Sequence, residues 1–205
     1  SDDVFDMTTS IQEAPDLPEE IEIEFSNGYP VKFGGENLKH IELINNANLL
    51  AGKHGFGRID MIEDRVVGIK SREIYEAPGL LLLIKAHQEL ESITLSPEVL
   101  EFKDFVEKKW SQLVYQGFWF GPLKEALDSF IESTQKYVNG IVKIRLHKGN
   151  AIIIGRNSLN NSLYREDLAT YSHDDSFNHE SAQGFIYMWG MANKIWAEST
   201  LKNTK

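Results

Sequence analysis

Alternating apolar and polar residues mark the start of the folded part of the chain. Residues 20–25 alternate strictly, so that every second side chain is apolar and lies on one face of an extended strand. Asn27 and Gly28 follow, and both residue types accept the left-handed backbone of a tight turn. The pattern predicts a β-hairpin whose second strand runs through Val31 and Phe33.

Apolar residues spaced three or four positions apart predict five helices. They span residues 37–51, 78–91, 96–117, 122–137 and 180–197. Gly52 ends the first helix, and Ser96 with Pro97 begins the third, because serine caps a helix and proline suits its first turn. The third helix is expected to bury one apolar stripe, formed by Leu100, Phe102, Phe105, Val106, Trp110, Leu113 and Val114.

Two more extended regions complete the pattern. Residues 57–67 predict a strand with a tight bend at residues 63–65, and extended chain then continues to Gly68. Residues 138–146 and 151–155 predict a second hairpin, with its turn at residues 148–150.

Hairpins separated by long helical blocks predict an α+β fold in which antiparallel hairpins pack with several helices. An acidic arm without apolar periodicity occupies residues 1–18, and such an arm is most often a linker. We expect one main domain at residues 19–178. The aromatic-rich helix at residues 179–205 forms a C-terminal segment.

Charge and composition reduce the number of functional classes to which the chain can belong. The chain has 205 residues, 31 acidic against 21 basic side chains, a net charge of −10 and no cysteine. Nucleic-acid binding depends on concentrated positive charge, so the balance argues against such a partner. The longest apolar run, residues 80–84, is too short to span a bilayer, and no signal peptide precedes the acidic start. We therefore expect a cytoplasmic protein without a membrane partner.

Residues 52–58, Gly-Lys-His-Gly-Phe-Gly-Arg, form the densest glycine stretch. Backbone N–H groups in such a turn can bind an anion. However, the spacing matches neither the P-loop nor the dinucleotide fingerprint, so a helix stop followed by a sharp turn is the simpler interpretation.

The histidines give no metal motif. His87 and Glu91 lie four residues apart, as in a surface pair on a helix. His173-Asp174-Asp175 with His179-Glu180 has no calcium-loop spacing and is typical of a solvated loop. No GxSxG segment is present to position a serine nucleophile.

Glu63 and Tyr75 permit two interpretations. With Gly68, Lys70, Ser71 and Arg72 between them, they could bind an amino-acid-like ligand, the carboxylate holding an ammonium group and the hydroxyl a carboxylate or amide. Alternatively, Glu63 is solvated and the ring of Tyr75 packs in the core.

Several long motifs, in order, resemble the argininosuccinate synthase family. They are Ala51–Asp60 (AGKHGFGRID), Glu63–Arg65, Gly68–Pro78 (GIKSREIYEAP), Leu113–Pro122 (LVYQGFWFGP), Lys148-Gly149, Gly155-Arg156, Ser162–Tyr164, Leu168–Tyr171 and Gly184–Ile186. The resemblance covers the chain from about Leu17 onward.

The resemblance implies a ligase that joins citrulline to aspartate and converts ATP, bound with Mg²⁺, to AMP and pyrophosphate. Enzymes of this family have an N-terminal nucleotide-binding domain with a Ser-Gly-Gly-x-Asp loop, and no such loop occurs here. The chain therefore resembles the second, synthetase and multimerisation domain, with residues 1–18 as the arm that leaves the first. ATP and aspartate contacts are expected outside it.

The resemblance assigns citrulline contacts to Glu63 and Tyr75, where they hold the unreacted end of the substrate. It assigns no catalytic residue and no metal ligand to this chain. Asp64 stands where some relatives have Asn, and residues 157–161 depart from the family pattern.

The family also forms homotetramers through C-terminal segments. Met188, Trp189, Met191 and Trp196 resemble the apolar anchors of such interfaces, although they could equally cover this domain's own core. Two other possibilities stay open: an oligomerisation module without ligand affinity, and a regulatory protein that has borrowed the domain. We expect no turnover from the isolated chain.

Overall fold

The computed structural model describes residues 4–158, 160–169 and 176–201. The chain divides into two compact units, Ser1–Tyr164 and Arg165–Lys205. Helices and antiparallel sheets are both present, which confirms the predicted α+β class.

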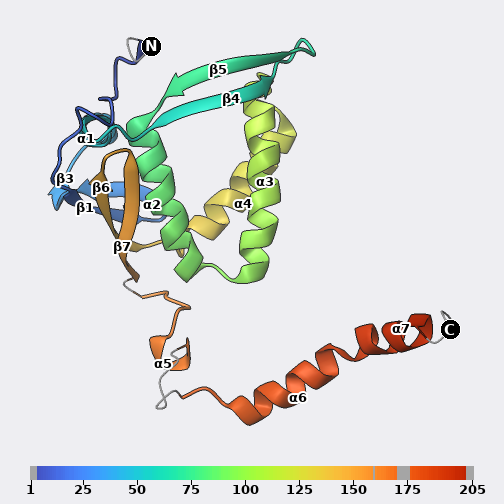
Figure 1. The fold of residues 1–205 in the computed structure, drawn as a ribbon. Coiled ribbons are helices and arrows are strands. Elements are labelled where there is room, and N and C mark those ends of the chain that lie inside the picture. Colours follow the sequence, from blue (N-terminus) through green and yellow to red (C-terminus); the bar gives the residue numbers. More distant parts are fainter. Residues whose placement is uncertain (1–3, 159, 170–175, 202–205) are drawn as a thin grey trace. The chain divides into compact units, whose positions relative to one another are not determined.

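An antiparallel sheet in the order β3-β2-β1-β6-β7 forms the centre of the first unit (Figure 1). Both predicted hairpins are confirmed, with left-handed turn residues at Asn27-Gly28 and Lys148-Gly149. The strands are β1 (Glu19–Ser26), β2 (Tyr29–Phe33), β3 (Glu36–Asn37), β6 (Gly140–His147) and β7 (Asn150–Ser158).

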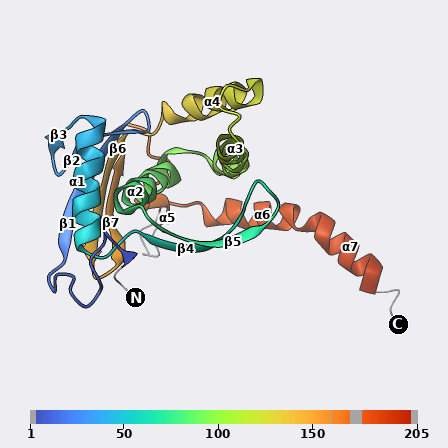
Figure 2. The ribbon, with the colours of Figure 1, turned by 90° about the horizontal axis from the view of Figure 1, so that it is seen from above.

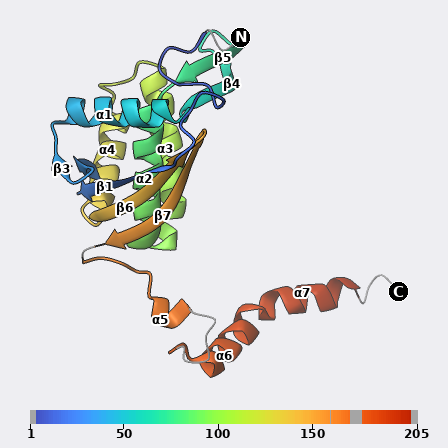
Figure 3. The same ribbon diagram turned by 60° about the vertical axis from the view of Figure 1, so that its left-hand side comes forward.

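Helices α1 (His40–Lys53) and α2 (Pro78–Thr94) pack against each other on one face of this sheet, and Figure 3 shows α2 running crosswise to α1 behind strands β6 and β7. The side chains between them and the sheet are apolar and buried; they include Ile23, Phe25, Val142, Ile144, Leu146, Leu43, Ala47, Leu82, Ala86 and Leu90. The other face of β1 and β6 is polar, with Glu20 paired to Lys143 at 3.0 Å and Arg145 at 2.8 Å. Alternation along the strands thus produces one buried and one solvated face.

Helices α3 (Pro97–Tyr115) and α4 (Pro122–Gln135) lie on the side of α2 away from the sheet (Figure 2). The predicted stripe on α3 is only partly correct. Val106 and Leu113 are buried, whereas Phe102 and Phe105 are more than half exposed. The reason is that α3 also buries a charged residue, Lys103, against α2.

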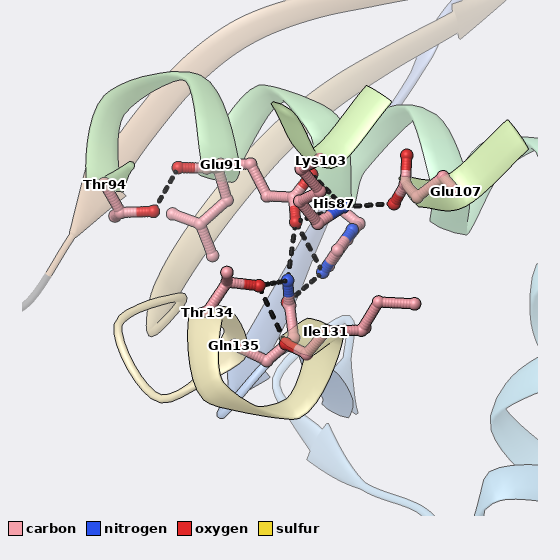
Figure 4. A network of polar contacts seen from close by, with 9 residues as sticks. His87, Glu91, Thr94, Lys103, Glu107, Ile131, Thr134 and Gln135 are labelled. Carbon is pink, nitrogen blue, oxygen red and sulfur yellow. Dashed lines mark hydrogen bonds and ion pairs between the residues drawn. The ribbon is translucent and has the colours of Figure 1, made fainter. Parts of the chain in front are cut away.

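Lys103 belongs to a buried polar network between α2, α3 and α4 (Figure 4). Its ammonium lies 2.9 Å from a carboxylate oxygen of Glu91 and also contacts Glu107. Gln135 donates to Glu91 at 2.7 Å, and its amide oxygen lies 2.7 Å from Nε2 of His87. The expectation that His87 and Glu91 form a surface pair is wrong, because the Glu91 side chain is only 5% exposed.

The segment between α1 and α2 forms a separate two-stranded ribbon of β4 (Arg58–Asp64) and β5 (Lys70–Glu76). The predicted bend at residues 63–65 is wrong: Glu63 and Asp64 end β4, and the turn lies at residues 65–68. Gly68 adopts φ = +85° in this turn. The sequence did not predict strand β5 after Gly68. Charged residues occupy several of its positions, so the alternation of apolar and polar side chains is hidden.

The glycine stretch at residues 52–58 is a helix stop and a turn, as its simpler interpretation predicted. Helix α1 ends at Lys53, and Gly55 and Gly57 both have positive φ. A side chain at Gly57 would collide with the backbone of Pro78, so this position requires glycine. The first helix begins at His40 and not at residue 37, since Asn37 pairs in β3.

The second unit contains α5 (Glu166–Ala169), α6 (His179–Trp189) and α7 (Met191–Leu201). The predicted tail helix is two helices, with Gly190 between them. No residue of α6 or α7 is buried, and Met188, Trp189 and Trp196 are well exposed. Of the predicted solvated loop, His173–Asp175 lies outside the described residues, whereas His179 and Glu180 begin α6 and are exposed. Among the helices described, none is long and apolar enough to cross a membrane.

Candidate functional site

The β4–β5 ribbon brings Glu63 and Tyr75 to one face. In the antiparallel register, Ile59 lies opposite Tyr75, Met61 opposite Glu73 and Glu63 opposite Ser71. Because residues directly opposite each other share a face and alternate residues repeat it, these six side chains lie on one side of the ribbon. The twelve-residue spacing of Glu63 and Tyr75 therefore gives proximity through a hairpin.

The Glu63 carboxylate accepts hydrogen bonds from three side chains. The hydroxyl of Tyr75 donates to Oε2 at 2.7 Å. Nη1 of Arg65 donates to Oε1 at 2.9 Å, and the hydroxyl of Tyr115 donates to the same oxygen at 3.3 Å. The turn of the ribbon, its second strand and the end of α3 thus meet at one carboxylate.

The structure reverses the simpler interpretation of both residues. The Glu63 side chain is only 12% exposed, and Tyr75 is 41% exposed. Tyr75 is therefore not a core residue, and Glu63 is not freely solvated. The carboxylate lies beneath its donors, whereas the tyrosine ring borders open solvent.

Hydrogen bonding also sets the ionisation of the pair. The hydrogen bond from Tyr75 lowers the pKa of Glu63, and Arg65 and Tyr115 add to this effect against the opposing influence of burial. The same hydrogen bond raises the pKa of Tyr75. At neutral pH the site therefore holds an anionic carboxylate and a protonated tyrosine.

The residues between Glu63 and Tyr75 divide between the two faces of the ribbon. Ser71 shares the site face, and its hydroxyl is shielded from solvent without a hydrogen-bond partner among the described residues. Lys70 and Arg72 point to the opposite face and pair with Asp64 and Asp60, at 2.6 and 2.9 Å. Asp64 follows Glu63 directly in the sequence but therefore points away from the site.

Sequence reasoning missed Arg65 and Tyr115 as parts of the site. Arg65 lies within the same short motif as Glu63, so the motif itself was an available signal. Tyr115 is 52 residues from Glu63, at the end of α3, and only the tertiary fold brings it there. Across the described ranges, no cluster of three or more His, Asp or Glu side chains has the geometry of a metal site.

Comparison with known proteins identifies the family of this chain. The family described as "Arginosuccinate synthase C-terminal domain" matches residues 1–196. The chain therefore belongs to the argininosuccinate synthase C-terminal domain family.

Individual relatives of this chain are argininosuccinate synthases. The argininosuccinate synthase of Prochlorococcus marinus subsp. pastoris (strain MED4) is 74% identical over 204 residues, which cover all of this chain and half of that protein. The enzyme of strain MIT 9301 is 73% identical over 98% of the chain, and that of strain NATL2A is 60% identical over 96%. The chain spans about half the length of the curated relatives it matches.

Proposed function

We propose that the chain is the C-terminal half of an argininosuccinate synthase, an ATP-dependent carbon–nitrogen ligase of arginine biosynthesis. Such an enzyme joins citrulline and aspartate to give argininosuccinate, AMP and pyrophosphate. Family membership supports the reaction, and the carboxylate of Glu63 beneath three donors supports a role in amino-acid binding.

Within this function, Glu63 and Tyr75 hold the amino-acid end of citrulline. An anionic carboxylate suits the α-ammonium group, because charge-assisted hydrogen bonds are the stronger ones. The hydroxyl of Tyr75 donates its single proton to Glu63 in this structure, and on citrulline binding it turns that proton to the α-carboxylate while the ammonium takes its place at Glu63. That end of citrulline does not react, so these residues position the ureido group and take no part in bond making.

The sequence of this chain contains no Ser-Gly-Gly-x-Asp loop for the phosphates of ATP. Its one Gly-Gly pair, Gly34-Gly35, forms the short turn from β2 to β3, with φ of +62° and +85°, and is preceded by Phe33. We therefore place ATP, its Mg²⁺ and aspartate mainly in the other half of the enzyme, and we propose that the isolated chain is inactive.

We also propose that the C-terminal helices serve assembly into a cytoplasmic homotetramer. The exposure of Met188, Trp189 and Trp196 supports this role, since aromatic residues and methionine are enriched in interface cores. The competing function is an assembly module without ligand affinity.

The decisive test of the citrulline site uses the full-length polypeptide that contains this chain. Glu63→Gln should raise the citrulline KM at least about tenfold, because a hydrogen bond to a charged group contributes roughly 1.5–3 kcal/mol. Asp64→Asn is the matched control: it neutralises the neighbouring carboxylate on the opposite face and should leave this KM unchanged. An unchanged KM in Glu63→Gln would remove Glu63 from the site.

Experiments on the isolated chain distinguish a citrulline half-site from an assembly module without ligand affinity. Calorimetry with citrulline measures binding, and light scattering measures assembly. Binding, even weak, supports the half-site, whereas assembly with no binding favours the module. Argininosuccinate formed by this chain from ATP, citrulline and aspartate would contradict the proposed division of labour.

A further inference from the structure

The root of the β4–β5 ribbon holds a segment of the N-terminal arm. Oε2 of Glu76, the last residue of β5, accepts hydrogen bonds from the backbone N–H groups of Asp6 and Met7 at 2.8 and 3.1 Å. The hydroxyl of Thr8 donates to its other carboxylate oxygen. One carboxylate thus binds three consecutive residues of the arm.

Arg58, the first residue of β4 and the register partner of Glu76, holds the same segment. Its Nε donates to the hydroxyl oxygen of Thr8 at 2.7 Å, and its Nη2 donates to the Thr8 carbonyl at 3.1 Å. Its guanidinium lies 3.7 Å from the ring centroid of Phe5. Thr8 is 6% exposed, so the contact is shielded from water.

This contact lies on the face of the ribbon opposite the site. Neighbouring residues of a strand point to opposite faces. When Glu76 is hydrogen-bonded to the arm on one face, Tyr75 therefore points to the other face, where Glu63 lies. A two-stranded ribbon is only marginally stable by itself. The arm supports the ribbon at its root, and Tyr115 contacts it near its tip.

The ionisation of Glu76 is consistent with this arrangement. Burial tends to raise its pKa, but the hydrogen bonds from the Thr8 hydroxyl and from the arm's backbone together lower the pKa below its ordinary value. The carboxylate therefore stays charged, and these hydrogen bonds stay strong, throughout the neutral range.

We propose that Glu76 is a positioning residue for citrulline: by holding residues 6–8 of the arm behind the ribbon, it fixes Tyr75 relative to Glu63. This inference rests on the proposed function. It gives the arm, which the sequence describes as a linker, a structural part in substrate binding.

The test measures steady-state kinetics of the full-length polypeptide with Glu76→Gln and with Thr8→Val. Both variants should raise the citrulline KM roughly fivefold and leave kcat and the KM values for ATP and aspartate within about twofold. A merely structural role would lower the fraction of active enzyme, and hence kcat, without changing the citrulline KM. Asp60→Asn is the control, since it weakens an ion pair with Arg72 on the same ribbon and removes none of the hydrogen bonds that join Glu76 to residues 6–8.

The double variant sharpens the test. Glu76 and Thr8 act through one contact, so their effects on KM should combine to less than the product of the two. An unchanged citrulline KM in both single variants, or fully multiplicative effects, would overturn the proposal. If Glu76→Gln fails to fold, Thr8→Val decides alone, because it preserves side-chain shape. An unchanged citrulline KM in Glu63→Gln would instead contradict the proposed citrulline site itself.

Discussion

Helix α2 separates two regions that are stabilised by different interactions, apolar packing in one and buried ion pairs with hydrogen bonds in the other. Toward the sheet it presents Leu82, Ala86 and Leu90 to a continuous apolar core. Toward α3 and α4 it presents His87 and Glu91 to a buried polar network (Figure 4). Helix α2 therefore packs against an apolar core on one side and against a network of charged and polar residues on the other.

The comparison shows how differently the two regions respond to change. Apolar burial is non-directional and scales with area, so the loss of one side chain removes only its share. A buried ion pair gains little net stability, because desolvation offsets the attraction, yet removal of one partner strands the other charge. The polar junction therefore depends on the pairing of specific groups, whereas the core depends on volume.

The largest effect is expected from Lys103→Met. The substitution preserves length but leaves the Glu91 carboxylate buried without its cation, and it should destabilise the fold by about 4 kcal/mol. Urea unfolding of the chain measures this difference. A loss below about 1 kcal/mol would mean that Glu91 finds other partners and that the junction is not fragile.

Leu82→Ala probes the other side of the same helix. Leu82 is fully buried, and its truncation should destabilise the fold by about 3 kcal/mol through lost burial and a residual cavity. The same unfolding experiment applies. The exposed neighbour Leu80 provides the control, since Leu80→Ala should have less than half of this effect.

The double variant Lys103→Met/Glu91→Leu distinguishes pairing from packing. When both charges are replaced by apolar groups of similar size, stability should return to within about 1 kcal/mol of the unmodified chain. No double substitution of large to small residues in the core would recover in this way. Additive losses from the two changes would contradict the description of the junction as an ion pair.

The smallest effect is expected from pH. Burial tends to lower the pKa of Lys103, but the hydrogen bonds that its ammonium donates to Glu107 and Glu91 outweigh burial and raise this pKa above its ordinary value of 10.5. A raised pKa stabilises the fold below 10.5, and this contribution is lost only as the pH rises through the higher folded value. The stability difference between the unmodified chain and Lys103→Met should therefore vary by less than about 0.5 kcal/mol between pH 7 and 9.

Much of the apolar half of the molecule could be predicted from sequence. Strict alternation at residues 20–25 and the Asn27-Gly28 turn specified a hairpin because local rules suffice there. Likewise, Pro78 and Pro97 begin α2 and α3 as proline at the first helical turn predicts.

The sequence-based predictions were wrong where contacts between residues far apart in the sequence determine the structure. Phe102 and Phe105 are apolar, as core residues are, but α3 turns Lys103 and Val106 to the interior, and both rings are more than half exposed. Strand β5 has few apolar residues because most of its side chains face solvent or the site. For the site, the resemblance supplied Glu63 and Tyr75, while the contact with Tyr115 required the tertiary fold.

The close approach of Gly57 to Pro78 makes the ribbon a lever. The amide of Ala77 donates to the Gly57 carbonyl at 2.9 Å, so β4, β5 and the first turn of α2 share one stiff pivot. Glu63 lies six residues away, about 20 Å along the strand. A rotation of about 3° at the pivot would therefore move Glu63 by about 1 Å. A small angular change at the root therefore becomes a displacement of about an ångström at Glu63, about a third of the length of a hydrogen bond.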